Sequence, residues 1–364
     1  MRRTLIITAT GLALAMPFAA CGGDSPQKAA PPATAAKKPL TKAELIQRVQ
    51  HGVAKVFAED ELGKSSGSAI LIDADKGLLV TNAHVVRTAG SLSVRFAGVK
   101  GQIPATILGV SDCRGDLAAI KIDPDDVPEK AQALTFAESN QAKVGDELAV
   151  VGYQGTIRGW NTAKPRVSFG VVSDTGIANA DLGPEIARGQ GSLLMTDATL
   201  DHGVSGGVMA NTFGEVVAIA TYSAGPGDGY GFEADVVRKT LPDLVKGRGG
   251  TTGVQTIPVS ELDMADVIYA LHADKGVDRA MARSMGRAAE DLGGLFVVGA
   301  TANSPADRKG IRFGHVIRKM NGIKVGNQTQ LCKVQRSSSV VKVEGYDLEW
   351  KHFADDFTRR VRVK

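Results

Sequence analysis

The sequence predicts a mainly β protein, in which many short strands form the larger domain and a smaller α+β domain follows. Short runs rich in Val, Ile, Leu and Thr, bounded by Gly and Asp, recur between residues 67 and 234. About a dozen such runs, with turn residues between them, are typical of β-sandwiches or barrels. The 43 glycines suit a chain with that many tight turns. After residue 247 the pattern changes to a mixture of strand and helix.

Residues 1–20 have the layout of a signal peptide. Two arginines follow the initiator Met, and an apolar or small stretch without charges comes next. This stretch is short for a membrane-spanning helix. It ends in small residues just before Cys21, which resembles the site where bacterial lipoproteins are cleaved and acylated. We expect lipid on Cys21, which anchors a protein to a membrane without spanning it. Secretory cleavage after Ala20 with no lipid is the alternative.

The segment 21–40 is rich in Pro, Ala and Gly and nearly free of large apolar groups, so we expect a flexible tether. Thr41 and Glu44 then form a capping-box pattern, which predicts a short helix over residues 42–50. The formal net charge is only +4, and nothing in its distribution calls for a nucleic-acid partner.

Besides Cys21, the chain contains only Cys113 and Cys332. Because these two are widely separated in sequence, a disulfide framework is not expected, and two free buried thiols are the default. We interpret Cys113 as a packing residue rather than as a redox switch.

Three residues, far apart in the sequence, have the side chains of a nucleophile, a base and an acid that orients the base. Ser205 lies between glycines in "DHGVSGGVM" (201–209), His84 ends a strand-like run, and Asp116 begins another. A serine hydroxyl is a poor nucleophile until a base removes its proton and a third group orients that base. Each residue alone is commonly an ordinary turn or hydrogen-bonding residue. Their joint order, His then Asp then Ser, points to a serine hydrolase.

A different hydrolase motif also fits the serine. Gly203–Gly207 matches the G-x-S-x-G nucleophile elbow, which requires a strand-to-helix turn and the order Ser, acid, His. Here a hairpin pattern follows the serine, and the downstream histidines lie in or beyond the second domain. The elbow interpretation therefore fails. His202 is expected to be an exposed loop residue and not a second base.

The motifs "TNAHVV", "DLAAIKI" and "DHGVSGGVM", in this order, resemble the HtrA (Deg) family of serine proteases. The likeness extends through "GSAILID" (67–73) and "KVGDELAVVGY" (143–153), and "GGLFVVGATANSPADRKGIRFGHVIRKMNGIKV" (293–325) resembles a bacterial PDZ domain. The resemblance implies a trypsin-like fold of two six-stranded antiparallel β-barrels, followed by a smaller α+β PDZ-like domain. The expected divisions are a protease domain at 41–247, a linker at 248–256, a PDZ-like domain at 257–345 and a C-terminal tail at 346–364.

The resemblance also implies roles for single residues. His84 is expected to be the general base, Asp116 to orient it, and Ser205 to be the nucleophile. The N–H groups of Gly203 and Ser205 are expected to form an oxyanion hole. The family usually has Asn and Pro where this chain has Val204 and Val208, which leaves the geometry of this loop open. No metal or other cofactor is implied.

A specificity pocket is expected at Thr199, with walls near Tyr222 and Phe232. Because no acid stands at Thr199, a small apolar side chain is the expected preference. PDZ domains bind C-terminal carboxylates through a glycine-containing loop. The best local candidate, residues 268–272, has Ala270 where glycine is expected, which argues against carboxylate binding. A regulatory or structural lid is the alternative role of this module.

The sequence as a whole predicts a lipid-anchored, extracytoplasmic serine endopeptidase of the bacterial envelope. The expected substrates are unfolded or specific envelope polypeptides, in protein quality control or regulated proteolysis, with a further peptide ligand for the PDZ-like domain. The alternative is an inactive or chaperone-like protein that holds polypeptides on the same fold.

Overall fold

The structure is a computed structural model. It describes residues 37–60, 63–86, 89–111, 113, 115–138, 142–154, 164–178, 191–247, 252–300, 304–348 and 355–363. The predicted signal peptide 1–20, Cys21 and most of the predicted tether lie outside the described residues, as do residues 248–251 of the predicted linker. None of the described helices has both the length and the apolar character needed to cross a bilayer.

The first part of the chain forms a helix and an antiparallel sheet. Helix α1 (Lys42–Gln50) begins with the predicted capping box, in which Thr41 and Glu44 satisfy each other's main-chain N–H groups. The strands that follow are β1 (Val53–Asp60), β2 (Gly63–Asp73), β3 (Leu78–Asn82), β4 (Ser91–Phe96), β5 (Ile103–Pro104), β6 (Thr106–Ser111) and β7 (Leu117–Lys121). A short helix, α2 (Ala83–Val86), follows β3.

These strands form a seven-stranded sheet in the order β5-β4-β1-β2-β3-β7-β6. In place of the first predicted six-stranded barrel, the described residues thus form a sheet whose edge strands do not pair. The edge strand β5 is only two residues long and contains Pro104. Proline has no N–H group to donate, so it cannot continue a hydrogen-bonded ladder on both sides.

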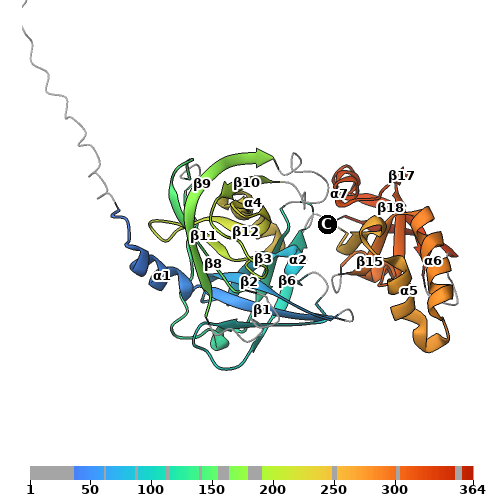
Figure 1. Cartoon of the computed structure of the whole chain (residues 1–364), viewed down its shortest axis with the longest axis horizontal. Coiled ribbons are helices and arrows are strands. Elements are labelled where there is room, and N and C mark those ends of the chain that lie inside the picture. Colours follow the sequence, from blue (N-terminus) through green and yellow to red (C-terminus); the bar gives the residue numbers. More distant parts are fainter. Residues whose placement is uncertain are drawn as a thin grey trace, which may run out of the picture. The chain divides into compact units, whose positions relative to one another are not determined.

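The second group of strands closes into a barrel, as Figure 1 shows. Its strands are β8 (Glu147–Gly152), β9 (Arg166–Ala178), β10 (Ser192–Thr196), β11 (Val208–Asn211), β12 (Val216–Gly225) and β13 (Asp228–Glu233). Helix α4 (Ala234–Val245) follows the last strand. One apolar cluster contains buried residues of both strand groups, among them Ile70 and Val80 from the sheet and Val151 and Val208 from the barrel. This shared core fixes the sheet against the barrel.

The C-terminal region (residues 252–363) is a separate antiparallel sheet with helices packed on it. Its strands are β14 (Val254–Pro258), β15 (Leu295–Ala300), β16 (His315–Met320), β17 (Ile323–Lys324), β18 (Val340–Asp347) and β19 (Asp355–Arg362). Its helices are α5 (Met264–His272), α6 (Arg279–Leu292) and α7 (Gln328–Arg336). The strand order is β14-β15-β16-β18-β19, with β17 paired to β16. Strand β19, from the predicted tail, thus belongs to this sheet.

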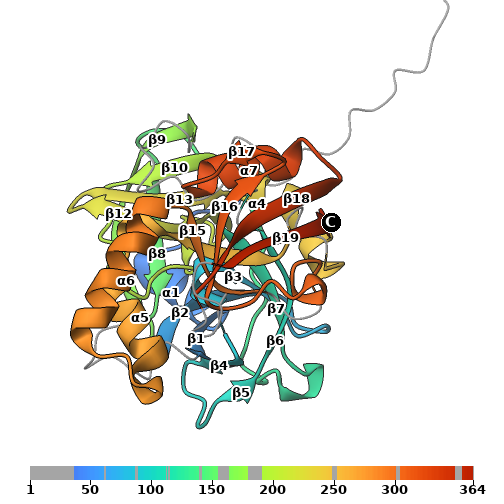
Figure 2. The same ribbon diagram turned by 90° about the vertical axis from the view of Figure 1, so that its right-hand side faces the viewer.

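Helices α5 and α6 lie side by side and pack with β15, β16 and β18 around Phe296, Val316 and Tyr346 (Figure 2). Residues 268–272, the expected carboxylate-binding loop, are the last turns of helix α5. Main-chain N–H groups inside a helix are used by the helix itself, so this segment does not offer them to a ligand.

The expectation of free thiols at Cys113 and Cys332 was wrong, because the two residues form a disulfide with a Cα–Cα distance of 5.2 Å. Their separation of 219 residues in sequence concealed their proximity in space. The disulfide joins the segment before β7 to helix α7 of the C-terminal region. Cys113 is completely buried and belongs to the apolar cluster that contains Leu331 and Val334. Packing was therefore correctly predicted for Cys113, and its covalent partner was not.

Candidate active site

His84 and Asp116 come together because the strands next to them are neighbours. Asn82 at the end of β3 pairs with Leu117 at the start of β7. Asp116 precedes Leu117 and accepts main-chain and side-chain hydrogen bonds on its carbonyl oxygen, from Ala83 N at 2.9 Å and Asn82 Nδ2 at 3.0 Å. These two hydrogen bonds hold the β3–α2 junction, which carries His84, against Asp116.

The Asp116 carboxylate makes two contacts with His84. Its Oδ1 accepts the main-chain N–H of His84 at 2.9 Å, and its Oδ2 lies 2.6 Å from Nδ1 of the imidazole. A carboxylate at Nδ1 favours the tautomer with the proton on Nδ1, which leaves Nε2 able to accept a proton. The Asp116 side chain is 2% exposed and that of His84 is 20% exposed, so the acid is buried and the imidazole reaches the surface.

Asp116 has an unusual backbone conformation for a residue with a side chain, at φ +40°. Asp and Asn adopt this left-handed region more readily than most residues, at a cost that the surrounding structure must offset. The hydrogen bonds from Ala83 and Asn82 are such a compensation.

Ser205 lies in a turn (residues 203–207, the Ser205 turn) that connects β10 to β11. Its Oγ donates a hydrogen bond to the carbonyl oxygen of Thr221 at 2.8 Å. The hydroxyl of Thr221 donates in turn to Oδ2 of Asp116 at 3.3 Å. In the described part of the chain, no hydrogen bond joins Ser205 to His84. The structure thus brings the three predicted residues into one hydrogen-bonded series, with Thr221 between Ser205 and Asp116.

The Ser205 turn is held by strand β2. The main-chain N–H of Ser68 donates to the Ser205 carbonyl oxygen at 2.8 Å, and its Oγ donates to the Gly203 carbonyl oxygen at 2.9 Å. Sequence reasoning did not identify Ser68 or Thr221. Neither has a signal of its own, because each is one polar residue inside an otherwise apolar strand pattern.

The two valines that depart from the family pattern are both buried. Val204 is 5% exposed in the core of the barrel, and Val208 is 0% exposed in the core shared with the sheet. Both therefore contribute to packing beneath the Ser205 turn. Gly203 has φ +91°, a conformation that glycine adopts without strain.

The three residues expected to line a specificity pocket have different environments. Thr199 is exposed, and its N–H donates to Ser168 Oγ at 2.9 Å. Tyr222 is half-buried and stacks on Tyr230 with ring centroids 5.0 Å apart, and burial raises the pKa of its hydroxyl. Phe232 is fully buried in the barrel core against Leu193, with no surface left to line an open pocket.

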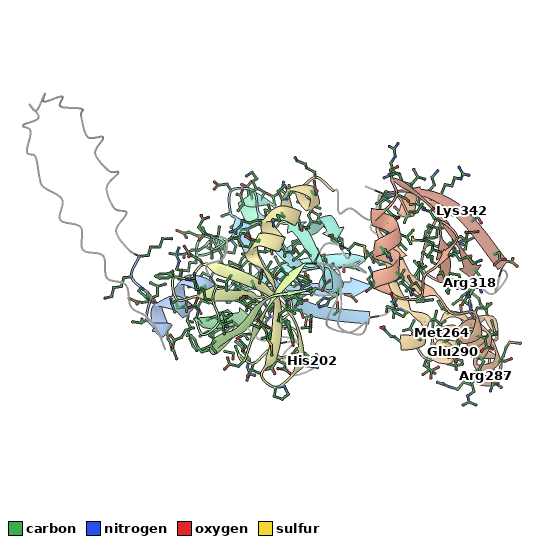
Figure 3. The ribbon with its side chains drawn as sticks, turned by 90° about the horizontal axis from the view of Figure 1, so that it is seen from above. His202, Met264, Arg287, Glu290, Arg318 and Lys342 are labelled. Carbon is green, nitrogen blue, oxygen red and sulfur yellow. A yellow bond between two sulfur atoms is a disulfide. The ribbon has the colours of Figure 1, made fainter. Side chains whose placement is uncertain are left out.

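His202 is exposed, and Figure 3 shows its ring pointing away from the barrel. The expectation of an exposed loop residue agrees with this position.

Residues 67–219 match the family model described as "Trypsin-like peptidase domain". The chain is 26% identical over 292 residues to "Serine protease HTRA1A" of Danio rerio, covering 79% of this chain and 56% of that protein. It is 29% identical over 261 residues to "Periplasmic serine endoprotease DegP" of Escherichia coli strain K12, covering 70% and 48%. This chain spans about half the length of the curated relatives that it matches.

Among solved structures, the chain is similar to "HtrA-type protease AlgWS227A with tripeptide". The TM-score is 0.50 at 21% identity, covering 89% of this chain and 98% of that one. It is also similar to the "serine endoprotease from Yersinia pestis", with a TM-score of 0.48 at 19% identity, covering 90% and 99%. The first of these likenesses supports the mainly β, trypsin-like fold.

Proposed function

Because the chain is a homologue of the HtrA-type serine proteases with a trypsin-like peptidase domain, we propose that it is a serine endopeptidase that uses His84, Asp116 and Ser205. The observation that carries the proposal is the continuous hydrogen-bonded series from His84 through Asp116 and Thr221 to Ser205. The His84–Asp116 pair supplies a base and the group that orients it, and Thr221 links the candidate nucleophile to the same Asp116 carboxylate.

In the proposed reaction, the Ser205 hydroxyl rotates away from the Thr221 carbonyl and attacks the carbonyl carbon of the substrate. Its proton passes to Nε2 of His84, while Asp116 stabilises the imidazolium. The protonated His84 then gives this proton to the leaving amine, and an acyl-enzyme remains on Ser205. Water, deprotonated by His84, attacks the acyl carbon and releases the acid, and Ser205 regains a proton.

The developing oxyanion needs donors that are already oriented. We assign this role to the main-chain N–H groups of Gly203 and Ser205. The absence of a side chain on Gly203 supports the assignment, because a Cβ there would crowd the substrate. Removing one such donor costs a rate factor of about 10²–10³ in serine proteases of known mechanism.

Labelling with a fluorophosphonate probe tests the proposal, since such probes react with activated serines. We expect the wild-type protein to be labelled and to cleave an unfolded protein substrate, and Ser205→Ala to do neither. Ser223→Ala, which changes an exposed serine on β12, is the matched control and should behave as wild type. If wild-type labelling persists in Ser205→Ala, or if neither protein reacts, the endopeptidase proposal is wrong.

One observation favours a second candidate function, a polypeptide-binding protein without catalysis. The Ser205 hydroxyl donates to Thr221 and not to His84, which is a resting arrangement and not a reactive one. This candidate predicts that substrate peptides protect the protein from thermal unfolding equally in wild type and Ser205→Ala, without cleavage. Intact residue types at all three positions favour the enzyme.

We further propose an extracytoplasmic location with a lipid anchor on Cys21. The disulfide supports an oxidising compartment, because such bonds are rare in the cytosol. Several relatives carry "periplasmic" in their names. Mass spectrometry of the mature N-terminus tests the anchor: acyl groups on Cys21 support it, and an unmodified N-terminus contradicts it.

The proposed substrates are polypeptides cleaved after small apolar residues. The C-terminal region (residues 252–363), which contains the range 257–345 expected from the sequence, is proposed to be a PDZ-like domain. The lack of an acid at Thr199 supports the apolar preference. Cleavage-site profiling that returned mainly Lys or Arg sites would remove this preference.

A further inference from the structure

Ser68, on strand β2, lies between the strand that leads to His84 and the turn that carries Ser205. We propose that Ser68 is a positioning residue: its main-chain N–H holds the Ser205 carbonyl, and its hydroxyl fixes the Gly203 peptide group of the Ser205 turn in the arrangement that the reaction needs. This inference rests on the proposed peptidase function and adds a residue to its machinery.

The N–H, hydroxyl and carbonyl groups of Ser68 all make hydrogen bonds, three of them to the Ser205 turn or to β3. Its N–H donates to Ser205 O at 2.8 Å, and its Oγ donates to Gly203 O at 2.9 Å. The same Oγ accepts the N–H of Tyr153 at 2.8 Å, while the Ser68 carbonyl accepts Thr81 Oγ1 at 2.6 Å. Ser68 is 0% exposed, so water does not compete for these partners.

The bonds to the turn restrict a specific peptide group. A peptide unit is planar, so holding a carbonyl oxygen also sets the direction of the next N–H group. Ser68 holds the carbonyls of residues 203 and 205, which belong to the peptide planes on either side of the one that contains the Ser205 N–H. The Ser205 N–H, assigned to the oxyanion hole, is therefore confined from both sides.

The contact between β2 and the turn is close. A Cβ added to Gly206 would lie 2.0 Å from Ser68 O and 2.4 Å from Thr81 Oγ1, so only glycine fits there. Thr81 is on β3, whose last residue, Asn82, nearly adjoins His84. Through Ser68, the strand that leads to the base and the turn that carries the nucleophile share one hydrogen-bonded junction.

Gly67 gives a second, independent sign of this proximity. A Cβ at Gly67 would stand 2.6 Å from Val85 Cγ1 and 3.1 Å from Ser205 O. Val85 directly follows His84. The residue next to Ser68 is thus within van der Waals reach of the neighbour of the base and of the nucleophile's own backbone.

The experiment compares Ser68→Ala with Ser65→Ala in the full chain. Ser65 is an exposed serine on the same strand, which makes it a matched control. We expect Ser68→Ala to lower kcat for a peptide substrate by about 10- to 100-fold with little change in KM, because the turn is misaligned in the transition state more than in substrate binding. The rate of fluorophosphonate labelling should fall in parallel. Ser65→Ala should match wild type in both assays.

Two further variants separate positioning from folding. Ser68→Thr keeps the hydroxyl and should recover at least about 10-fold of the lost kcat, whereas Ser68→Cys, a weak donor of similar shape, should not. If Ser68→Ala does not fold, the kcat values of Ser68→Cys and Ser68→Thr decide between a positioning role and a purely structural one. The melting temperature is measured for each variant.

The inference is overturned if Ser68→Ala has a lower melting temperature but the same kcat as wild type at assay temperatures well below that melting temperature. It is also overturned if Ser68→Cys is as active as Ser68→Thr. These results differ from a failure of the proposed function. If the proposed function itself is wrong, the wild-type protein shows no Ser205-dependent labelling or cleavage, and the positioning role of Ser68 is then wrong as well.

Discussion

Nδ1 of His84 and Oδ2 of Asp116 are 2.6 Å apart, and the second oxygen of the same carboxylate accepts the main-chain N–H of His84. The acid thus holds both the ring and the backbone of the residue beside it. This double attachment fixes the direction of the imidazole before any substrate arrives.

Replacing Asp116 with Asn is therefore expected to damage catalysis much more than folding. Asn tolerates the positive φ of this position, so the backbone is retained. Its amide favours the wrong imidazole tautomer, and kcat should fall on the order of 10⁴-fold at neutral pH. Peptide hydrolysis and a thermal melt of the same sample provide the measurement. A variant with near-wild-type kcat would contradict the assigned role of Asp116.

A glycine pair tests the tight contact between the Ser205 turn and β2. Gly206 and Gly227 both have φ +84°, but a Cβ at Gly206 would overlap Ser68 and Thr81, while a Cβ at Gly227 meets nothing within 4 Å. We expect Gly227→Ala to lower the free energy of unfolding by about 1–2 kcal/mol through backbone strain alone. Gly206→Ala should lower it by about 3 kcal/mol or more, because overpacking adds to the strain. Denaturant unfolding of both variants measures the difference, and equal losses would refute the close approach.

The disulfide between Cys113 and Cys332 should stabilise the chain. A crosslink between distant residues restricts the unfolded ensemble, and its loss typically costs about 2–4 kcal/mol. Calorimetry with and without a phosphine reductant should show a lower melting temperature after reduction. Cys332→Ala is the control, because it should melt at the reduced temperature whether or not the reductant is present. An unchanged melting temperature on reduction of the wild type would mean that the bond does not form.

His315 is expected to make the stability of the C-terminal region dependent on pH. Burial lowers the pKa of this imidazole below its ordinary value of 6.5, although Asp347 lies 3.3 Å from Nε2 and acts in the opposite direction. Arg312 reinforces the lowering: its positive charge opposes protonation, and its main-chain N–H occupies Nδ1. Arg359, a further cation, acts in the same direction.

Because the folded pKa lies below the unfolded one, the stabilising contribution of neutral His315 is complete above pH 6.5 and is lost as pH falls through the lowered value. His315→Asn keeps an acceptor near Nδ1 and should flatten the decline in melting temperature between about pH 7 and pH 5. His202→Asn, an exposed histidine of the barrel, is the control. The opposite outcome is that wild type loses stability as the pH is raised and His315→Asn removes this loss. The ion pair between His315 and Asp347 would then outweigh the effect of burial on the pKa of His315.

The sequence predicted the mainly β architecture and the pairing of His84 with Asp116, because short strands and an ordered set of reactive residues leave a local pattern. Ser68 and Thr221 left none, since their importance depends on which strands become neighbours. The first sheet stays open because β5 pairs with β4 alone among the described strands, and Pro104 in the sequence of β5 does not show which strand will be its neighbour. The disulfide was missed because cysteine spacing over long separations carries no information about distance in space.

The disulfide has a consequence for any cut within the chain. The residues between Cys113 and Cys332 include the whole closed barrel and Ser205, and they form a covalent ring with this bond. A molecule nicked once inside that ring keeps both pieces attached and migrates near its full mass on a denaturing gel without reductant. Self-digestion in this region would go unnoticed until a thiol is added to the sample, when two shorter bands replace one.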